Sequence, residues 1–128
     1  MLQDHAAAVA AREATILTGA ALKAADRLNL SGSTLAAVLG LSPASLTRMR
    51  RGQFLLERNA TGKAFELAVL FVRLYRSLDA IVGGDMAVAQ DWLRNQNTAL
   101  NGKPIDKIKS IPGLVETIAY LDARRAPV

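Results

Sequence analysis

Residues 33–52, STLAAVLGLSPASLTRMRRG, contain two short helical patterns separated by a glycine. Ser33 is a good N-cap for the first pattern, and Gly40 stands where a left-handed residue ends a helix. Ser42 then caps a second helix, with Pro43 at its first position, where the missing N–H has no cost. The stretch therefore predicts two short helices joined by a tight turn.

The apolar residues of these two helices follow the order of a helix-turn-helix. Six of them are expected to face inward: Leu35, Ala36, Leu39, Leu41, Leu46 and Met49. The order resembles the Xre/Cro-type helix-turn-helix over roughly residues 30–55. In such motifs the second helix lies in the major groove of DNA. The resemblance therefore implies an operator DNA as one partner.

The polar residues of the second helix are the candidates for contacts with DNA. Those near its N-terminus are expected to reach base edges: Ser42, Ala44, Ser45, Thr47 and Arg48. Arg48 is the best candidate for guanine, because arginine pairs bidentately with that base. Arg50 and Arg51 are expected at phosphates. Two alternatives stay open: a solvated helix end favoured by the helix dipole, and a helix-turn-helix retained only as a dimer scaffold.

Composition restricts the fold class and the compartment. The chain has 128 residues, of which 51% are hydrophobic and only 5% aromatic, and it is rich in alanine and leucine. Both residues favour helices, and no alternating strand pattern of useful length occurs, so the predicted class is all-α. The absence of cysteine excludes disulfides and thiolate metal sites and favours the cytoplasm. We expect no membrane span and no signal peptide.

The positive charge is concentrated in the first half of the chain. Residues 1–64 carry eight Lys or Arg and four acids, a net charge of +4. Residues 65–128 carry eight Lys or Arg and seven acids, a net charge of +1. This asymmetry is typical of a chain whose first half meets a polyanion.

Apolar spacing predicts further helices on either side of the motif. Leu17, Ala21, Ala24 and Leu28 form one stripe within residues 12–30, and residues 62–82 form a strong helix. On that helix one apolar face is expected, made by Phe65, Ala68, Val69, Val72, Tyr75 and Leu78. Further helices are predicted after Asp85, from Pro104 and over residues 113–125. We expect a DNA-binding region over 1–62 and a second helical region over 63–128, sharing one core.

The second region carries its own resemblance. Its markers are, in order, Trp92-Leu93, Asn97, Leu100, Gly102, Lys103, Pro104, Gly113 and Tyr120-Leu121. They resemble the toxin-binding region of the MbcA/ParS/Xre antitoxins, and with the helix-turn-helix the chain is most similar to Xre antitoxins of RES–Xre modules. The resemblance covers about residues 15–125, with a departure at Ile105-Asp106.

That resemblance implies a protein partner and a regulatory role. Such antitoxins bind a RES-domain toxin that consumes NAD⁺, occlude its active site, and repress their own promoter. The residues carried over to toxin binding are Trp92, Leu93, Asn97, Gly102, Lys103, Pro104, Tyr120, Leu121 and Arg124. We add the hypothesis that Arg124 and Arg125 reach an anionic substrate pocket. The competing interpretation is that these markers serve the fold and not a contact with toxin. They would then be core residues, turn residues, or a tyrosine whose hydroxyl hydrogen bond fixes the last helix.

Catalysis is the competing class of function, and the sequence argues against it. The only histidine, His5, lies in a segment expected to be frayed, and no zinc site, nucleophilic triad or phosphate loop is evident. We therefore expect no enzyme and no cofactor. Three hypotheses remain: an antitoxin that also represses, a stand-alone repressor whose second half only dimerises, and an interaction protein that no longer meets DNA. A homodimer is expected, because helix-turn-helix proteins commonly read two half-sites.

Overall fold

The structure, a computed structural model, describes residues 2–125 and is all-α, as predicted. In that range the only strand-like feature is one isolated bridge between Asn97 and Gly102. No helix in the described part of the chain is long and apolar enough to cross a lipid bilayer. The helices are α1 (Leu2–Arg27), α2 (Gly32–Leu39), α3 (Pro43–Arg50), α4 (Gly62–Val82), α5 (Met86–Arg94), α6 (Pro104–Lys107) and α7 (Ile111–Arg125).

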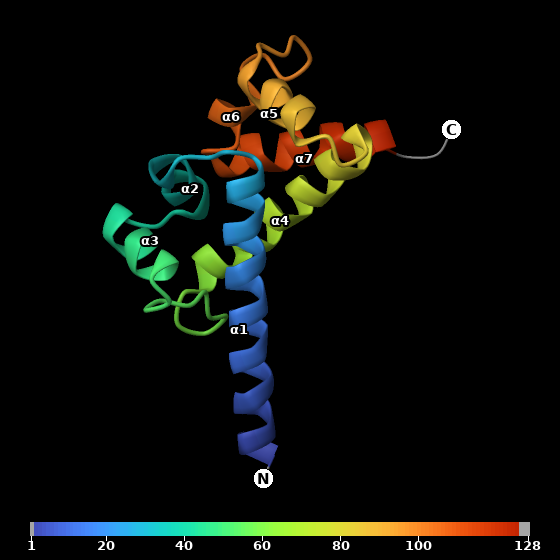
Figure 1. Ribbon diagram of the computed structural model, residues 1–128. Coiled ribbons are helices and arrows are strands. Elements are labelled where there is room, and N and C mark those ends of the chain that lie inside the picture. Colours follow the sequence, from blue (N-terminus) through green and yellow to red (C-terminus); the bar gives the residue numbers. More distant parts are fainter. Residues whose placement is uncertain (1, 126–128) are drawn as a thin grey trace.

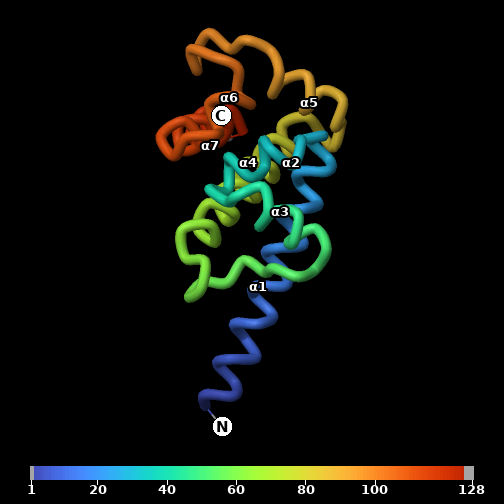
Figure 2. The backbone as a smooth tube through the Cα atoms, turned by 90° about the vertical axis from the view of Figure 1, so that its left-hand side faces the viewer, coloured from blue at the N-terminus to red at the C-terminus, as the bar shows by residue number. Residues whose placement is uncertain are grey.

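The first helix is longer than its apolar pattern predicts, because it extends back to Leu2. The added residues are mostly alanine, the strongest helix former. None of residues 2–12 is buried, and both views show this half of α1 projecting from the body of the molecule (Figure 1, Figure 2). His5, expected in a frayed segment, lies within this helix and is exposed.

The second half of α1 is part of the core. Its buried residues are small, namely Ala14, Thr18, Ala21, Ala24 and Ala25. Small side chains let α4 approach closely. Thr18 is the one polar member, and its hydroxyl accepts a hydrogen bond of 2.9 Å from the buried backbone N–H of Leu56. This bond anchors the segment between α3 and α4 to α1.

The two short helices α2 and α3 form with the predicted turn but with one different cap. Ser31, rather than Ser33, caps α2: its backbone is extended and its hydroxyl accepts from the N–H of Thr34. Ser33 lies inside the first turn, since Gly32 already has helical geometry. Gly40 has a φ of +66°, as the turn requires. Ser42 caps α3 and Pro43 opens it, as predicted.

Helix α4 has the predicted bounds but is buried on more than one face. Phe71 and Leu74, outside the predicted stripe, are fully buried, whereas Val69 within it is 45% exposed. The reason is that α1 and α2 pack on α4 from one part of the chain and α5 and α7 from the other. A single apolar stripe describes a helix covered on one side only. The buried side chains of both regions form one continuous core, as expected.

Helix α5 is tied to the end of α1 by hydrogen bonds. Asn29 has a φ of +56°, which turns the chain after α1 and leaves backbone carbonyls without helical partners. The Arg94 guanidinium donates to the carbonyls of Leu28, at 3.3 Å, and Asn29, at 2.7 Å. The Gln90 amide donates to the carbonyl of Arg27 at 2.8 Å. Residues some sixty-five positions apart in the sequence thus hold the two regions together.

The last two helices cover the remaining side of α4. Asp85 caps α5 and Pro104 opens α6, as predicted. Helix α7 begins at Ile111 and buries Leu114, Ile118 and Leu121. It crosses α4 near the top of the molecule in Figure 1.

Replacing Phe71 by alanine is expected to destabilise both regions together. Phe71 is fully buried at the centre of α4, and removing such a side chain costs about 3–5 kcal/mol. Urea unfolding should give coincident transitions by far-UV circular dichroism and by the fluorescence of Trp92, at a lower midpoint than the unsubstituted chain. The control is Ile81→Ala on the exposed side of the same helix, with a change within about 0.5 kcal/mol. Separate transitions in Phe71→Ala would contradict a shared core.

Candidate functional site

Helix α3 is fixed to the body by two buried side chains. Leu46 and Met49 are almost completely buried and belong to the common core. A Cβ at Gly32 would lie 3.4 Å from Leu46 Cδ2, so α2 and α3 cross at close contact. The face of α3 opposite these residues is left to solvent, with Ala44, Thr47 and Arg48 exposed and Ser45 half-buried.

The polar residues at the start of α3 are joined in one chain of hydrogen bonds. The Ser42 hydroxyl accepts from the Ser45 N–H at 3.1 Å and donates to the Ser45 hydroxyl at 3.1 Å. Arg48 Nη2 in turn donates to that hydroxyl at 3.2 Å. The Thr47 hydroxyl donates back to the carbonyl of Pro43 at 3.0 Å. The structure therefore brings Ser42, Ser45 and Arg48 together.

Arg48 has a second neighbour that the sequence did not indicate. Its guanidinium carbon lies 5.6 Å from the centre of the Phe54 ring, within cation–π range. Phe54 follows α3 in an irregular segment, where no periodicity relates it to the helix. The aromatic ring and the Ser45 hydroxyl together hold the guanidinium at the exposed face.

The three arginines of this stretch point in different directions. Arg50 forms an ion pair of 3.2 Å with Asp26 at the end of α1, and Arg51 is the exposed C-cap of α3. The Arg50–Asp26 pair is exposed, and such pairs contribute little to stability, so Arg50 is free to exchange its partner. Arg48 alone is held by neighbours on its own face.

A second set of candidates meets at the junction of α5 and α7. The rings of Trp92 and Tyr120 stack with their centres 6.1 Å apart and an angle of 19° between their planes. The Arg124 guanidinium lies 4.6 Å above the Tyr120 ring. Trp92 and Tyr120 are half-buried and Arg124 is exposed. These three side chains form a surface ladder from α5 to the end of α7.

Three other residues of this set are in the core and do not reach the surface. Leu93, Pro104 and Leu121 are buried in the isolated chain. None of the three is accessible at the surface of the isolated chain. Each lies within one residue of an exposed or half-buried candidate, so spacing along the sequence could not separate the two groups.

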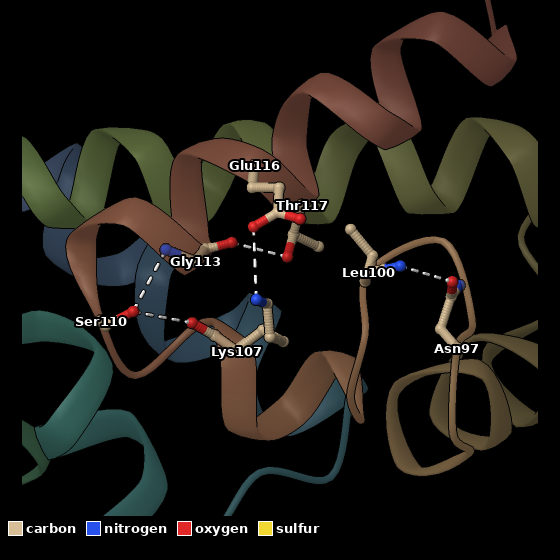
Figure 3. A network of polar contacts seen from close by, with 7 residues as sticks. All are labelled: Asn97, Leu100, Lys107, Ser110, Gly113, Glu116 and Thr117. Carbon is tan, nitrogen blue, oxygen red and sulfur yellow. Dashed lines mark hydrogen bonds and ion pairs between the residues drawn. The ribbon is translucent and has the colours of Figure 1, made fainter.

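The loop between α5 and α6 contains the next three candidates. Asn97 and Gly102 exchange two backbone hydrogen bonds, of 2.9 and 3.2 Å, and close the loop. The Asn97 side-chain oxygen accepts from the N–H of Leu100 at 3.1 Å, as Figure 3 shows. Lys103 is exposed at the end of this loop. Asn97 is thus a loop-shaping residue, while Lys103 is presented to solvent.

The start of α7 depends on the absence of a side chain at Gly113. A Cβ there would lie 1.9 Å from the carbonyl oxygen of Lys107, at the end of α6. The Gly113 N–H donates to the Ser110 hydroxyl and its carbonyl accepts from Thr117 at 2.7 Å (Figure 3). The Lys107 ammonium also pairs with Glu116 at 3.3 Å. Gly113 therefore sets the distance between α6 and α7.

The last arginine is directed at α4. Arg125 Nη1 donates to the Ser77 hydroxyl at 3.0 Å, and that hydroxyl donates to Asp122 at 2.8 Å. The Ser77 hydrogen bond, assisted by Arg73, holds the pKa of Asp122 below its usual range. Arg125 is thus engaged within the chain, so of the two terminal arginines Arg124 is the one on the ladder.

Comparison with known families matches two consecutive parts of the chain. Residues 7–73 match the model of the antitoxin Xre-like helix-turn-helix domain. Residues 77–126 match the model of the antitoxin Xre/MbcA/ParS C-terminal toxin-binding domain. The chain belongs to the Xre family of antitoxins. No curated protein matches its sequence.

As an Xre-family antitoxin the chain has a toxin and DNA as its partners. The first match contains α2 and α3, and the second contains α5, α6 and α7. Helix α4 ends the first match and begins the second. Among the described residues no group of three or more His, Asp or Glu side chains is arranged to hold a metal ion.

Substituting Gly113 by alanine is expected to lower the free energy of unfolding by about 3 kcal/mol, because the new methyl group would collide with the Lys107 backbone. The matched control is Gly19→Ala, in the middle of α1, where a Cβ meets nothing within 4 Å. That change should stabilise the antitoxin by up to about 1 kcal/mol. Chemical denaturation of both variants measures the two effects, and a Gly113→Ala variant as stable as the parent would refute the steric argument.

Proposed function

We propose that this antitoxin neutralises a RES-domain toxin that consumes NAD⁺, by covering the toxin's active site, and that it represses its own operon. The observation that carries the proposal is the separation of the two surfaces. Helix α3 lies on one side of the core, and helices α5 and α7, which carry the ladder residues, lie on another (Figure 1). An antitoxin of this shape has room for DNA and toxin at the same time.

The DNA-binding role is supported by the exposed face of α3. The candidates for base contacts are Ser42, Ala44, Ser45, Thr47 and Arg48. Arg48 is oriented by Ser45 and Phe54 before DNA binds, which reduces the entropy lost on binding. Arg50 and Arg51 are the proposed phosphate contacts, with Arg50 leaving Asp26 for a phosphate.

The choice of toxin rests on the resemblance to RES–Xre modules and on the charge of the ladder. NAD⁺ carries two phosphates, and a pocket for it must accept anionic groups. A guanidinium at the end of α7, stacked on Tyr120, offers a charge that fits such a pocket. We assign the direct contacts to Trp92, Tyr120, Arg124 and Lys103, and a positioning role to the buried Leu93, Pro104 and Leu121.

We further propose that the antitoxin acts as a homodimer, in which two copies of α3 read two half-sites of an operator. In this arrangement residues 1–62 serve DNA binding and residues 63–128 serve toxin binding. A stand-alone repressor is the second candidate, since the helix-turn-helix alone would suffice for it.

Co-expression with the protein encoded next to it tests the toxin assignment. The complex should purify as one species without NAD⁺ loss, and the partner freed by denaturation and refolding should consume NAD⁺. With Arg124→Ala, inhibition should be incomplete, so the complex should consume NAD⁺ at a measurable rate. With the control Lys23→Ala, on α1, inhibition should remain complete. An antitoxin that purifies alone and still binds its upstream DNA would favour the stand-alone repressor.

Replacing Arg48 by alanine tests the DNA assignment. We expect a loss of about 1–3 kcal/mol on the operator and a smaller loss on random DNA, because a bidentate contact with guanine is specific. Arg50→Ala should instead weaken binding to both DNAs equally. It should also reduce the slope of log affinity against log salt concentration by about one. Fluorescence anisotropy titrations at several salt concentrations measure both. Equal losses for Arg48→Ala on the two DNAs would make it a phosphate contact.

A further inference from the structure

An open apolar groove runs between α1 and α4, beside the C-terminal end of α7. Its volume is about 1100 Å³. Its apolar lining comes from α1 and α4 and consists of Val9, Ile16, Leu17, Ala20, Phe65, Val69 and Val72. Ile16 is 64% exposed and Val69 is 45% exposed. Side chains of this size left open to water are typical of a surface that is covered in the working assembly.

One wall of the groove is fixed by a chain of contacts. Arg58 donates two hydrogen bonds to Glu13, of 3.1 and 3.0 Å. The same guanidinium lies 4.7 Å from the centre of the Phe65 ring. These contacts join α1, the loop before α4 and α4 itself. The groove is therefore a formed surface and not a gap between loose segments.

The projecting half of α1 carries a matching apolar ridge. Leu2 is 87% exposed and Val9 is 53% exposed, and with Ile16 they recur every seven residues on one face of the helix. All of residues 2–12 are exposed. A helical segment this short is only marginally stable in water without packing. Packing against a partner would therefore stabilise this segment. Val9 and Ile16 belong both to the ridge and to the lining of the groove.

The charges of groove and ridge are complementary. Five arginines line the groove against two acids: Arg12, Arg58, Arg73, Arg76 and Arg125 against Glu13 and Asp122. Residues 2–11 contain Asp4 as their only charged side chain of Lys, Arg, Asp or Glu type. A second copy of this segment thus enters the groove without meeting like charge.

We propose that two copies of the chain associate through α1, each placing its projecting half in the groove of the other. The two α1 helices run antiparallel about a twofold axis at Val9, so that Val9 faces its equivalent and Leu2 of one copy faces Ile16 of the other. Residue 9 is midway between 2 and 16, so the ridge is self-complementary, as a twofold interface requires. This inference rests on the homodimer proposed above and identifies its surface.

The association state of the full chain, without DNA or toxin, tests the interface. In Val9→Lys two ammonium groups meet at the twofold axis, next to the arginines that line the groove, so we expect the dimer dissociation constant to rise at least about tenfold. Ala11→Lys is the matched control: it lies about 200° around the helix from Val9 and is exposed, and it should leave the dimer unchanged. Sedimentation equilibrium measures both, with circular dichroism to verify helix content.

A cysteine variant gives a second, independent measurement. The chain has no cysteine, so Val9→Cys introduces a single thiol; dissolved oxygen should oxidise the two thiols of a dimer to one intermolecular disulfide, while Ala11→Cys should not form this bond. A dimer that survives Val9→Lys and is not cross-linked through Val9→Cys would overturn this interface while leaving the homodimer standing. A parent chain that sediments as a monomer would overturn both, and neither result would bear on toxin binding.

Discussion

The position of α4 is the constraint on which both working surfaces depend. Phe71 and Leu74 are fully buried in it, and helices from both matched family regions pack around it. A helix covered in this way cannot shift toward one region without opening a cavity against the other. Packing around α4 therefore holds the helix-turn-helix and the α5–α7 ladder in one relative orientation.

Hydrogen bonds reinforce this orientation away from α4. Arg94 reaches from α5 to the carbonyls of Leu28 and Asn29, where the chain turns from α1 toward α2. Hydrogen bonds to charged groups contribute more than neutral ones, about 1.5–3 kcal/mol, when their surroundings are partly buried. These carbonyls lie in the short connection between α1 and α2, so the contact joins α5 to the segment that leads into the helix-turn-helix.

Local sequence preferences were sufficient to predict most of the helices, but not which residues of different helices contact one another. Gly40, Ser42 and Pro43 determine the turn through their own backbone preferences, so the helix-turn-helix could be predicted from sequence. The number of buried faces on α4, by contrast, depends on how many helices surround it. The apolar pattern of one helix does not contain that information. The pairing of Arg50 with Asp26 and the stacking of Arg48 on Phe54 likewise join residues without a regular spacing. Gly113 stood out in the sequence, but its reason lies in a backbone carbonyl six residues away.

The toxin-binding signature shows why a family pattern and a contact surface are different things. Its residues alternate between the core and the surface within a few positions: Leu93 and Leu121 are buried, while their neighbours Trp92 and Tyr120 stack at the surface. Buried positions must keep their volume for any member to fold, whatever toxin it meets. Exposed positions such as Arg124 are under no such packing demand. If the ladder and Lys103 contact the toxin, as proposed above, discrimination between toxins belongs to these exposed residues, and the buried residues of the signature hold that surface in shape.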